Sequence, residues 1–168
     1  MKYTPEMIVE ITERNLRLAR RKLAELPIHC GRVPAISGLH GWVYEQTIQF
    51  CLLKELAALR VKPEVDEQIK LGGRAKADFR LNHVLVEVKT SGLFGMSEVQ
   101  KYRKYRRWAE QAGCRYLFVS AYEGYLPYRR GICDAVGRKN VFLLDQPGHW
   151  SRLVSCLAKE LKSRKAQP

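Results

Sequence analysis

Two acids and a lysine stand on a short stretch that is typical of a β-hairpin, residues 75–90 (AKADFRLNHVLVEVKT). Apolar and branched residues fill both arms, and Asn82-His83 between them is a plausible two-residue turn. Counting back from this turn places Asp78 opposite Glu87, and Lys89 shares the face of Glu87 because side chains alternate along a strand. Facing carboxylates have Cβ atoms only about 5 Å apart and repel each other. A divalent cation with oxygen ligands would remove that repulsion, so the hairpin predicts a metal site.

The alternative is a solvated hairpin whose charges alternate by chance. The run Val84-Leu85-Val86 argues against it, because continuous apolar residues are typical of a strand that is buried on both faces. An uncompensated glutamate and lysine in such a strand would be costly. The buried setting therefore favours a functional role for Glu87 and Lys89.

A third candidate carboxylate, Glu45, lies outside the hairpin, in the stretch WVYEQTIQFCLLKELAALR. This stretch predicts a helix that begins at Gly41. The apolar stripe of this helix is formed by Ile48, Leu52, Leu56 and Leu59, and Glu45 lies on the same stripe one turn earlier. A carboxylate on a buried face needs a cation or a donor. A glutamate at a fraying helix start, reaching water, is the alternative.

Composition limits the partners. The chain has 168 residues, 46% of them hydrophobic, which is consistent with one domain and a sizeable core. Thirty Lys and Arg against 17 Asp and Glu give a net charge of +13, which favours a polyanion, nucleic acid before membrane, because no long apolar segment is present. A protein that is merely basic, or a scaffold for an acidic protein partner, would share this charge.

The five cysteines are scattered and never spaced as C-x-x-C. This usage predicts free thiols in a reducing cytoplasm rather than a zinc cluster. The N-terminus carries no signal-peptide pattern, since acids interrupt every apolar run.

The remaining chain predicts alternating helices and strands. A helix from Thr4 to Pro27 and a loop over 27–41 precede the Gly41 helix, and a first strand lies within 61–71. After the hairpin we expect a helix, a strand, a short helix, a strand and a final helix over 97–113, 114–121, 131–136, 140–145 and 150–161. This order predicts an α/β fold with a mixed β-sheet of about five strands flanked by helices, with the strand at 114–121 parallel to the one before it.

Two basic stretches are candidate nucleic-acid-binding surfaces. The helix after the hairpin interleaves Tyr102, Tyr105 and Trp108 with basic residues, namely Lys101, Arg103, Lys104, Arg106 and Arg107. Aromatics packed on the sheet would leave those basic residues in water, where a phosphate backbone could meet them. The tyrosine-rich loop 122–130 ends in Arg129 and Arg130, a second candidate surface, although its tyrosines could equally serve packing or turn formation.

These residues, in this order of elements, resemble the PD-(D/E)XK nuclease superfamily, which has the restriction-endonuclease-like fold. The similarity runs from about residue 38 to 145 and rests on a short series of positions: Gly41-x-x-x-Glu45, Asp78, Glu87-Val88-Lys89 and Gln100. The combination looks most like archaeal-type Holliday junction resolvases and related small nucleases. Ala77 stands where the name of the motif has proline, and Lys104 stands where Gln-x-x-x-Tyr would have tyrosine, which disfavours an exonuclease-like member.

The resemblance implies a three-layer sandwich and a single nuclease domain, with an N-terminal helix and loop (1–37), a catalytic core (38–145) and a C-terminal helix and basic tail (146–168). Asp78, Glu87 and the Val88 carbonyl would hold Mg²⁺, with Mn²⁺ as a substitute, and Glu45 would complete the site or help to hold a second ion. Lys89 would orient the attacking water or stabilise charge on the transition state, and Gln100 would position the water or a phosphate oxygen.

The residues and the resemblance together predict Mg²⁺-dependent hydrolysis of DNA phosphodiesters. One form of this activity is structure-selective cleavage of a DNA junction, which would require a homodimer to cut two strands symmetrically. Two alternatives stay open: a restriction-type endonuclease of the same fold, and a catalytically silent nucleic-acid-binding module.

Overall fold

The computed structural model describes residues 3–25, 36–72, 75–89, 96–120 and 128–163. Its elements are α1 (Pro5–Glu25), α2 (Ile36–Ala58), β1 (Val65–Gly72), β2 (Ala75–Leu81), β3 (Val84–Lys89), α3 (Met96–Gln111), β4 (Arg115–Ser120), α4 (Arg129–Val136), a 3-10 turn (Arg138–Asn140), β5 (Val141–Leu143) and α5 (His149–Ser163). The strands form one sheet in the order β1-β2-β3-β4-β5. Strands β1 to β3 pair antiparallel and β3 to β5 pair parallel. The predicted α/β class and mixed five-stranded sheet are confirmed.

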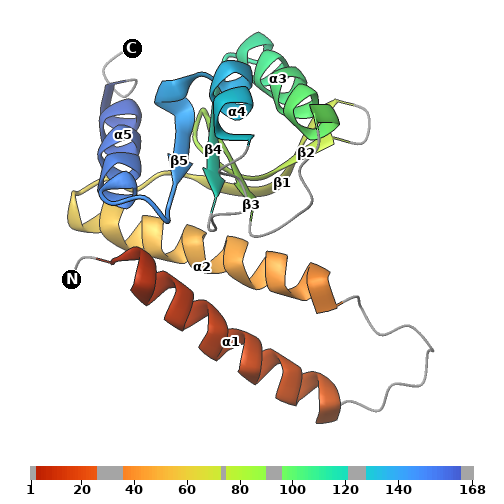
Figure 1. Cartoon of the computed structure of the whole chain (residues 1–168). Helices are drawn as coiled ribbons and strands as arrows, with labels where there is room; N and C mark the ends of the chain where they lie inside the picture. Colours follow the sequence, from red (N-terminus) through yellow and green to blue (C-terminus); the bar gives the residue numbers. More distant parts are fainter. Residues whose placement is uncertain (1–2, 26–35, 73–74, 90–95, 121–127, 164–168) are drawn as a thin grey trace.

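Helices cover both faces of this sheet, so the fold has three layers (Figure 1). On one face, α2 and α5 pack against the sheet, and α1 lies alongside α2 on its outer side. On the other face, α3 and α4 cover β4 and β5. We call these two sides the α2/α5 face and the α3/α4 face.

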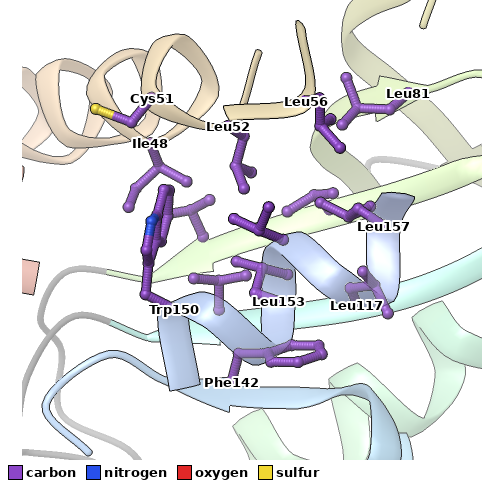
Figure 2. Packing of buried hydrophobic residues seen from close by; sticks show 14 of the residues in the cluster. Ile48, Cys51, Leu52, Leu56, Leu81, Leu117, Phe142, Trp150, Leu153 and Leu157 are labelled. Atoms are coloured by element: carbon purple, nitrogen blue, oxygen red, sulfur yellow. The ribbon is translucent and has the colours of Figure 1, made fainter. Parts of the chain in front are cut away.

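The α2/α5 face is the larger apolar core. Ile48, Leu52 and Leu56, spaced by four residues along α2, are each 0% exposed. They meet Leu153 and Leu157 of α5 above the sheet, as Figure 2 shows. Burial of a leucine or isoleucine side chain contributes about 1.5–3 kcal/mol, so this periodic stripe fixes how α2 lies across the sheet.

The hairpin of β2 and β3 forms as predicted. Its pairing runs from Leu81 opposite Val84 to Phe79 opposite Val86, with the two-residue turn between them. Asn82 adopts φ +53°, a left-handed conformation that asparagine tolerates better than most residues. Its Oδ1 also accepts a hydrogen bond of 2.7 Å from the N–H of Glu64, which ties the turn to the start of β1.

Three boundary predictions were wrong. Helix α2 begins at Ile36, before Gly41, because the packing of its later turns outweighs the roughly 1 kcal/mol cost of a glycine inside a helix. Leu59 lies in the turn after α2 and is 44% exposed, so it is not part of the buried stripe. Arg129 and Arg130 form the first turn of α4 and are not in a loop.

The aromatic residues of α3 serve packing. Tyr102 is fully buried, with its ring centroid 4.9 Å from that of Phe118 on β4. Trp108 lies against the end of β1, where a Cβ on Gly72 would stand 3.2 Å from the indole. A side chain at Gly72 would therefore push α3 away from the sheet. Of the basic residues of α3, Lys104 and Arg107 are exposed, as the packing alternative predicted, whereas Lys101, Arg103 and Arg106 are half-buried.

Candidate functional site

The hairpin opens where its acids lie. Assigned pairing of β2 with β3 stops at Phe79 and Val86, one pair before Asp78 would face Glu87. Ala77 packs in the cluster on the α3/α4 face and Phe79 in the cluster on the opposite face, so the alternation of side chains breaks at Asp78. On the neighbouring strand Gln68, the residue across from this break, has φ +52°. Two adjacent strands thus depart from regular geometry at the level of the candidate site.

Beyond this break, the side-chain carboxylate of Asp78, and not a backbone carbonyl of β2, accepts the hydrogen bond of the Val88 N–H. Its Oδ2 accepts a hydrogen bond of 2.6 Å from the N–H of Val88. The N–H and C=O groups of one strand residue point to the same side, so the Val88 carbonyl is also directed toward β2, where regular pairing has ended. Asp78 and the Val88 carbonyl, two of the predicted metal ligands, therefore lie together.

Glu87 and Lys89 form a close ion pair. The Lys89 Nζ lies 2.7 Å from the Glu87 Oε1, and the side chain of Glu87 is 2% exposed. The second oxygen, Oε2, is also buried and has no hydrogen-bond partner among the described residues. An unpaired buried carboxylate oxygen is costly, which singles out this atom as one that would accept a ligand.

Burial raises the pKa of Glu87 to about 7, against the attraction of Lys89. The pKa of Asp78 is likewise raised by burial, although Lys89 and the Val88 N–H both oppose the rise. From α2, Glu45 belongs to the same group: burial raises its pKa to about 7, and the charge of Asp78 adds to the rise. The structure therefore brings together the three predicted acids, which come from three different elements.

The ammonium group of Lys89 is attracted by all three carboxyl groups. Burial alone would lower the pKa of Lys89, but the attraction of Glu87 and Asp78 outweighs it and raises the pKa. Lys101 on α3 also acts on Asp78 and Glu87, lowering the pKa of both. Three carboxyl groups close to the Lys89 ammonium leave the site short of positive charge, and burial raises the pKa of all three.

A hard divalent cation would fit this deficit. In the described part of the chain no group of three or more His, Cys, Asp or Glu side chains forms a ready-made metal site. The donors available are the carboxylates of Asp78 and Glu87, with Glu45 near them, and the Val88 carbonyl. These are oxygen ligands of the kind that Mg²⁺ and Mn²⁺ prefer, and the unpartnered Glu87 Oε2 is one of them.

Gln100 is not drawn into this group by any contact of the described residues. Its side chain is exposed, and its Oε1 accepts a hydrogen bond of 3.2 Å from Arg103, one turn further along α3. Its predicted role in positioning water stays a prediction.

The basic residues of α3 differ in how free they are. Lys101 pairs with Glu98 at 3.3 Å and Arg106 with Glu110 at 2.7 Å. Lys104 and Arg107 are exposed, with the Lys104 ammonium 4.8 Å from the centroid of Trp108. A groove of about 250 Å³ between α3 and α4 is lined by Arg103, Arg106, Arg107, Glu110, Asp134 and Ala135. A phosphate backbone would meet mainly the exposed cations of this surface.

Two tyrosines near the acids were missed as site residues. Burial raises the pKa of Tyr105, and the charge of Glu87 raises it further. The same two causes hold the pKa of Tyr116 well above its usual range. Tyr105 lies one helical turn after Lys101, so the i to i+4 spacing on α3 was the signal that could have found it.

Comparisons with protein-family models, with curated proteins and with solved structures found no match to this chain. None of the described helices is long and apolar enough to cross a membrane.

Proposed function

We propose that this protein is a divalent-metal-dependent deoxyribonuclease of the restriction-endonuclease-like fold, which hydrolyses phosphodiester bonds. The observation that carries the proposal is the gathering of Glu45, Asp78 and Glu87 around one partly buried lysine, Lys89, at a point where the regular pairing of β2 with β3 ends. A binding surface for a polyanion has no need of buried carboxylates, which would repel phosphate.

Each residue has a role in this proposal. Asp78, Glu87 and the Val88 carbonyl would hold Mg²⁺ or Mn²⁺, and Glu45 would complete the site. When bound, such an ion polarises the scissile phosphate and lowers the pKa of a water molecule. Lys89 would stabilise the negative charge that develops on the phosphate, since its raised pKa keeps it protonated and unsuited to act as a base.

The net charge of +13 and the exposed cations of α3 suit a nucleic-acid substrate. Structure-selective cleavage, such as that of a four-way junction, is the form of the activity that a small domain of this kind suggests. Symmetric cutting of two strands would require a homodimer, which sedimentation of the protein with and without junction DNA would detect.

The test is cleavage of supercoiled plasmid and of a synthetic four-way junction in Mg²⁺, in Mn²⁺ and in EDTA. Asp78→Asn keeps an oxygen that can accept the Val88 N–H but removes the charge. We expect it to lower the cleavage rate at least about 100-fold, and Lys89→Met to do so as well. Asp66→Asn is the matched control, because Asp66 is an exposed aspartate of β1 that pairs with Arg80; it should cut at the wild-type rate.

Metal binding can be read without turnover. Mg²⁺ or Mn²⁺ should raise the melting temperature of the wild type and of Asp66→Asn but not of Asp78→Asn, because a ligand of the folded state stabilises it. Wild-type protein that binds both DNAs but cuts neither in either metal would defeat the nuclease proposal. The catalytically silent binding module would then be the better account.

A further inference from the structure

A basic cavity lies at the β5 edge of the sheet, between α4 and the start of α5, and none of the three acids lines it. Its volume is about 750 Å³, it is open to solvent, and it is lined by residues of α4, the turn before β5, β5 itself and the start of α5. Four arginines and one aspartate are the charged residues of the lining: Arg129, Arg130, Arg138, Arg152 and Asp134. We call it the arginine cavity. Its lining thus carries an excess of positive charge in a space that could hold a small ligand.

Several of these guanidinium groups converge. Burial raises the pKa of the Cys133 thiol, which lines the cavity, and three arginines from three elements oppose the rise: Arg129, Arg138 and Arg152. The imidazole of His149, another lining residue, has its pKa lowered by burial and then by Arg152 and Arg129. Three exposed arginines from three elements therefore lie close enough to act on the same lining group.

Most of the arginines are uncommitted. Arg152 donates a hydrogen bond of 2.6 Å to the Val141 carbonyl and lies 4.9 Å from the centroid of Phe142, so it has a structural role. Arg129, Arg130 and Arg138 form no hydrogen bond or ion pair with the described residues. Like charges that converge without partners destabilise a fold, and an anion in the cavity would reverse that effect.

The arginine cavity and the acids are joined by two rows of residues across the parallel strands. Lys89 lies beside Ser120 and Ser120 beside Leu143, while Glu87 lies beside Phe118 and Phe118 beside Val141. Val141 and Leu143 both line the cavity. Strands are spaced by about 4.8 Å, so the two sites are about 10 Å apart along the sheet. Glu87 and Lys89 lie at the carboxyl end of β3, where ligands commonly bind in parallel sheets.

We propose that the arginine cavity binds a terminal phosphate group, carried either by a free nucleotide or by the end of a DNA strand. Several donors around one group suit a phosphate monoester, which carries more charge and more free oxygens than a phosphodiester. Arginine is favoured for this task because its planar fork of donors matches phosphate oxygens. The proposal does not depend on nuclease activity, and binding in EDTA tests it alone.

The first measurement is calorimetric titration of the protein with inorganic pyrophosphate, in EDTA and at constant ionic strength. We expect one site per chain. The double variant Arg129→Gln/Arg138→Gln removes two uncommitted guanidinium groups and should weaken binding by about tenfold or more. Arg17→Gln, an exposed arginine of α1, is the matched control and should bind as the wild type does. Asp134→Asn removes the acid of the lining and should bind pyrophosphate more tightly.

A 12-nucleotide DNA strand with a 5′-phosphate or a 5′-hydroxyl distinguishes the two sources. Tighter binding of the phosphorylated strand, lost in Arg129→Gln/Arg138→Gln, would identify the strand end as the ligand. Equal binding of both strands, with pyrophosphate still bound, would identify the free phosphate compound. The proposal is overturned if the wild type does not bind pyrophosphate. It is equally overturned if a folded double variant, checked by circular dichroism, binds it as well as the wild type or if Arg17→Gln loses as much.

Discussion

The two faces of the sheet differ in the polarity of the side chains that they bury. The α2/α5 face buries aliphatic and aromatic side chains over a large area (Figure 2), and its exception is the unpartnered indole N–H of Trp150. The α3/α4 face buries a glutamate, a serine and a tyrosine hydroxyl in a smaller cluster. Three of the four buried polar atoms that lack a partner in the described chain lie on this side: Glu87 Oε2, Tyr116 Oη and Ser120 Oγ.

The α2/α5 face mainly stabilises the fold, whereas the α3/α4 face carries polar groups that could take part in chemistry. An unpartnered buried polar group costs about 1–3 kcal/mol, so the α3/α4 face lowers the stability of the fold at the same place where it holds Glu87. The apolar packing on the opposite face offsets that cost. Functional sites commonly carry such local violations of good packing, and three of the four in the described chain lie on the α3/α4 side of this sheet.

The largest effect that this comparison predicts is on the apolar side. Leu52→Ala removes a fully buried side chain between α2 and α5 and should lower the free energy of unfolding by about 3 kcal/mol, because the cavity left behind adds to the lost burial. Leu59→Ala, in the turn that follows the same helix, where Leu59 is 44% exposed, should cost less than about 1 kcal/mol. Denaturant unfolding measures both, and equal losses would contradict the assignment of the core.

Glu87 should make stability depend on pH in the sense opposite to that of an ordinary carboxylate. Its folded pKa is raised from 4.5 to about 7, so its contribution is fully present below pH 4.5 and is lost as the pH rises through 7. In EDTA, the free energy of unfolding of Glu87→Gln should therefore rise relative to that of the wild type by about 1–3 kcal/mol between pH 5 and pH 8. The exposed Glu10→Gln is the control. Parallel stability curves for the wild type and Glu87→Gln would show that the Glu87 carboxylate is not penalised by burial.

The smallest effect concerns a single hydroxyl. Tyr116→Phe removes a buried Oη that has no partner among the described residues, and it should leave stability unchanged or raise it by up to about 1 kcal/mol. Tyr102→Phe loses a hydrogen bond of 3.4 Å to Glu98 and should change stability in the opposite direction. Thermal melting of the two variants side by side decides the sign. A loss in Tyr116→Phe would mean that its hydroxyl is satisfied after all.

Much of this site could be predicted because its parts are local. The two-residue turn at Asn82 sets the register of β2 against β3, so counting along the chain placed Asp78 opposite Glu87, although regular pairing ends one pair earlier, at Phe79 and Val86. The placing of Glu45 was possible because it lies three residues, about one helical turn, before Ile48 on α2 and so shares its side of the helix. Short-range periodicity therefore accounts for the predicted acids.

The rest depends on contacts that leave no pattern. The residues Ala77-Asp78-Phe79 follow the apolar–polar–apolar pattern of a regular strand. The sequence therefore does not predict that the alternation of side chains between the two faces of the sheet breaks at this point. The arginine cavity joins residues of α4 and α5 that share no spacing, and Arg129 read as the end of a loop. Gly41 suggested a helix start, and only tertiary packing explains why α2 begins earlier.

The capped edge of β5 has a consequence for aggregation. The outer N–H of Leu143 donates to the Nδ1 of His149 at 2.9 Å, and the Val141 carbonyl is taken by Arg152. Two α5 side chains thus occupy the positions that a neighbouring strand would use. At the other edge, Gln68 with its positive φ interrupts the straight template of β1. Both borders of the sheet are therefore poor templates for the growth of fibrils, and loss of the Arg152 cap should make the protein more prone to form them.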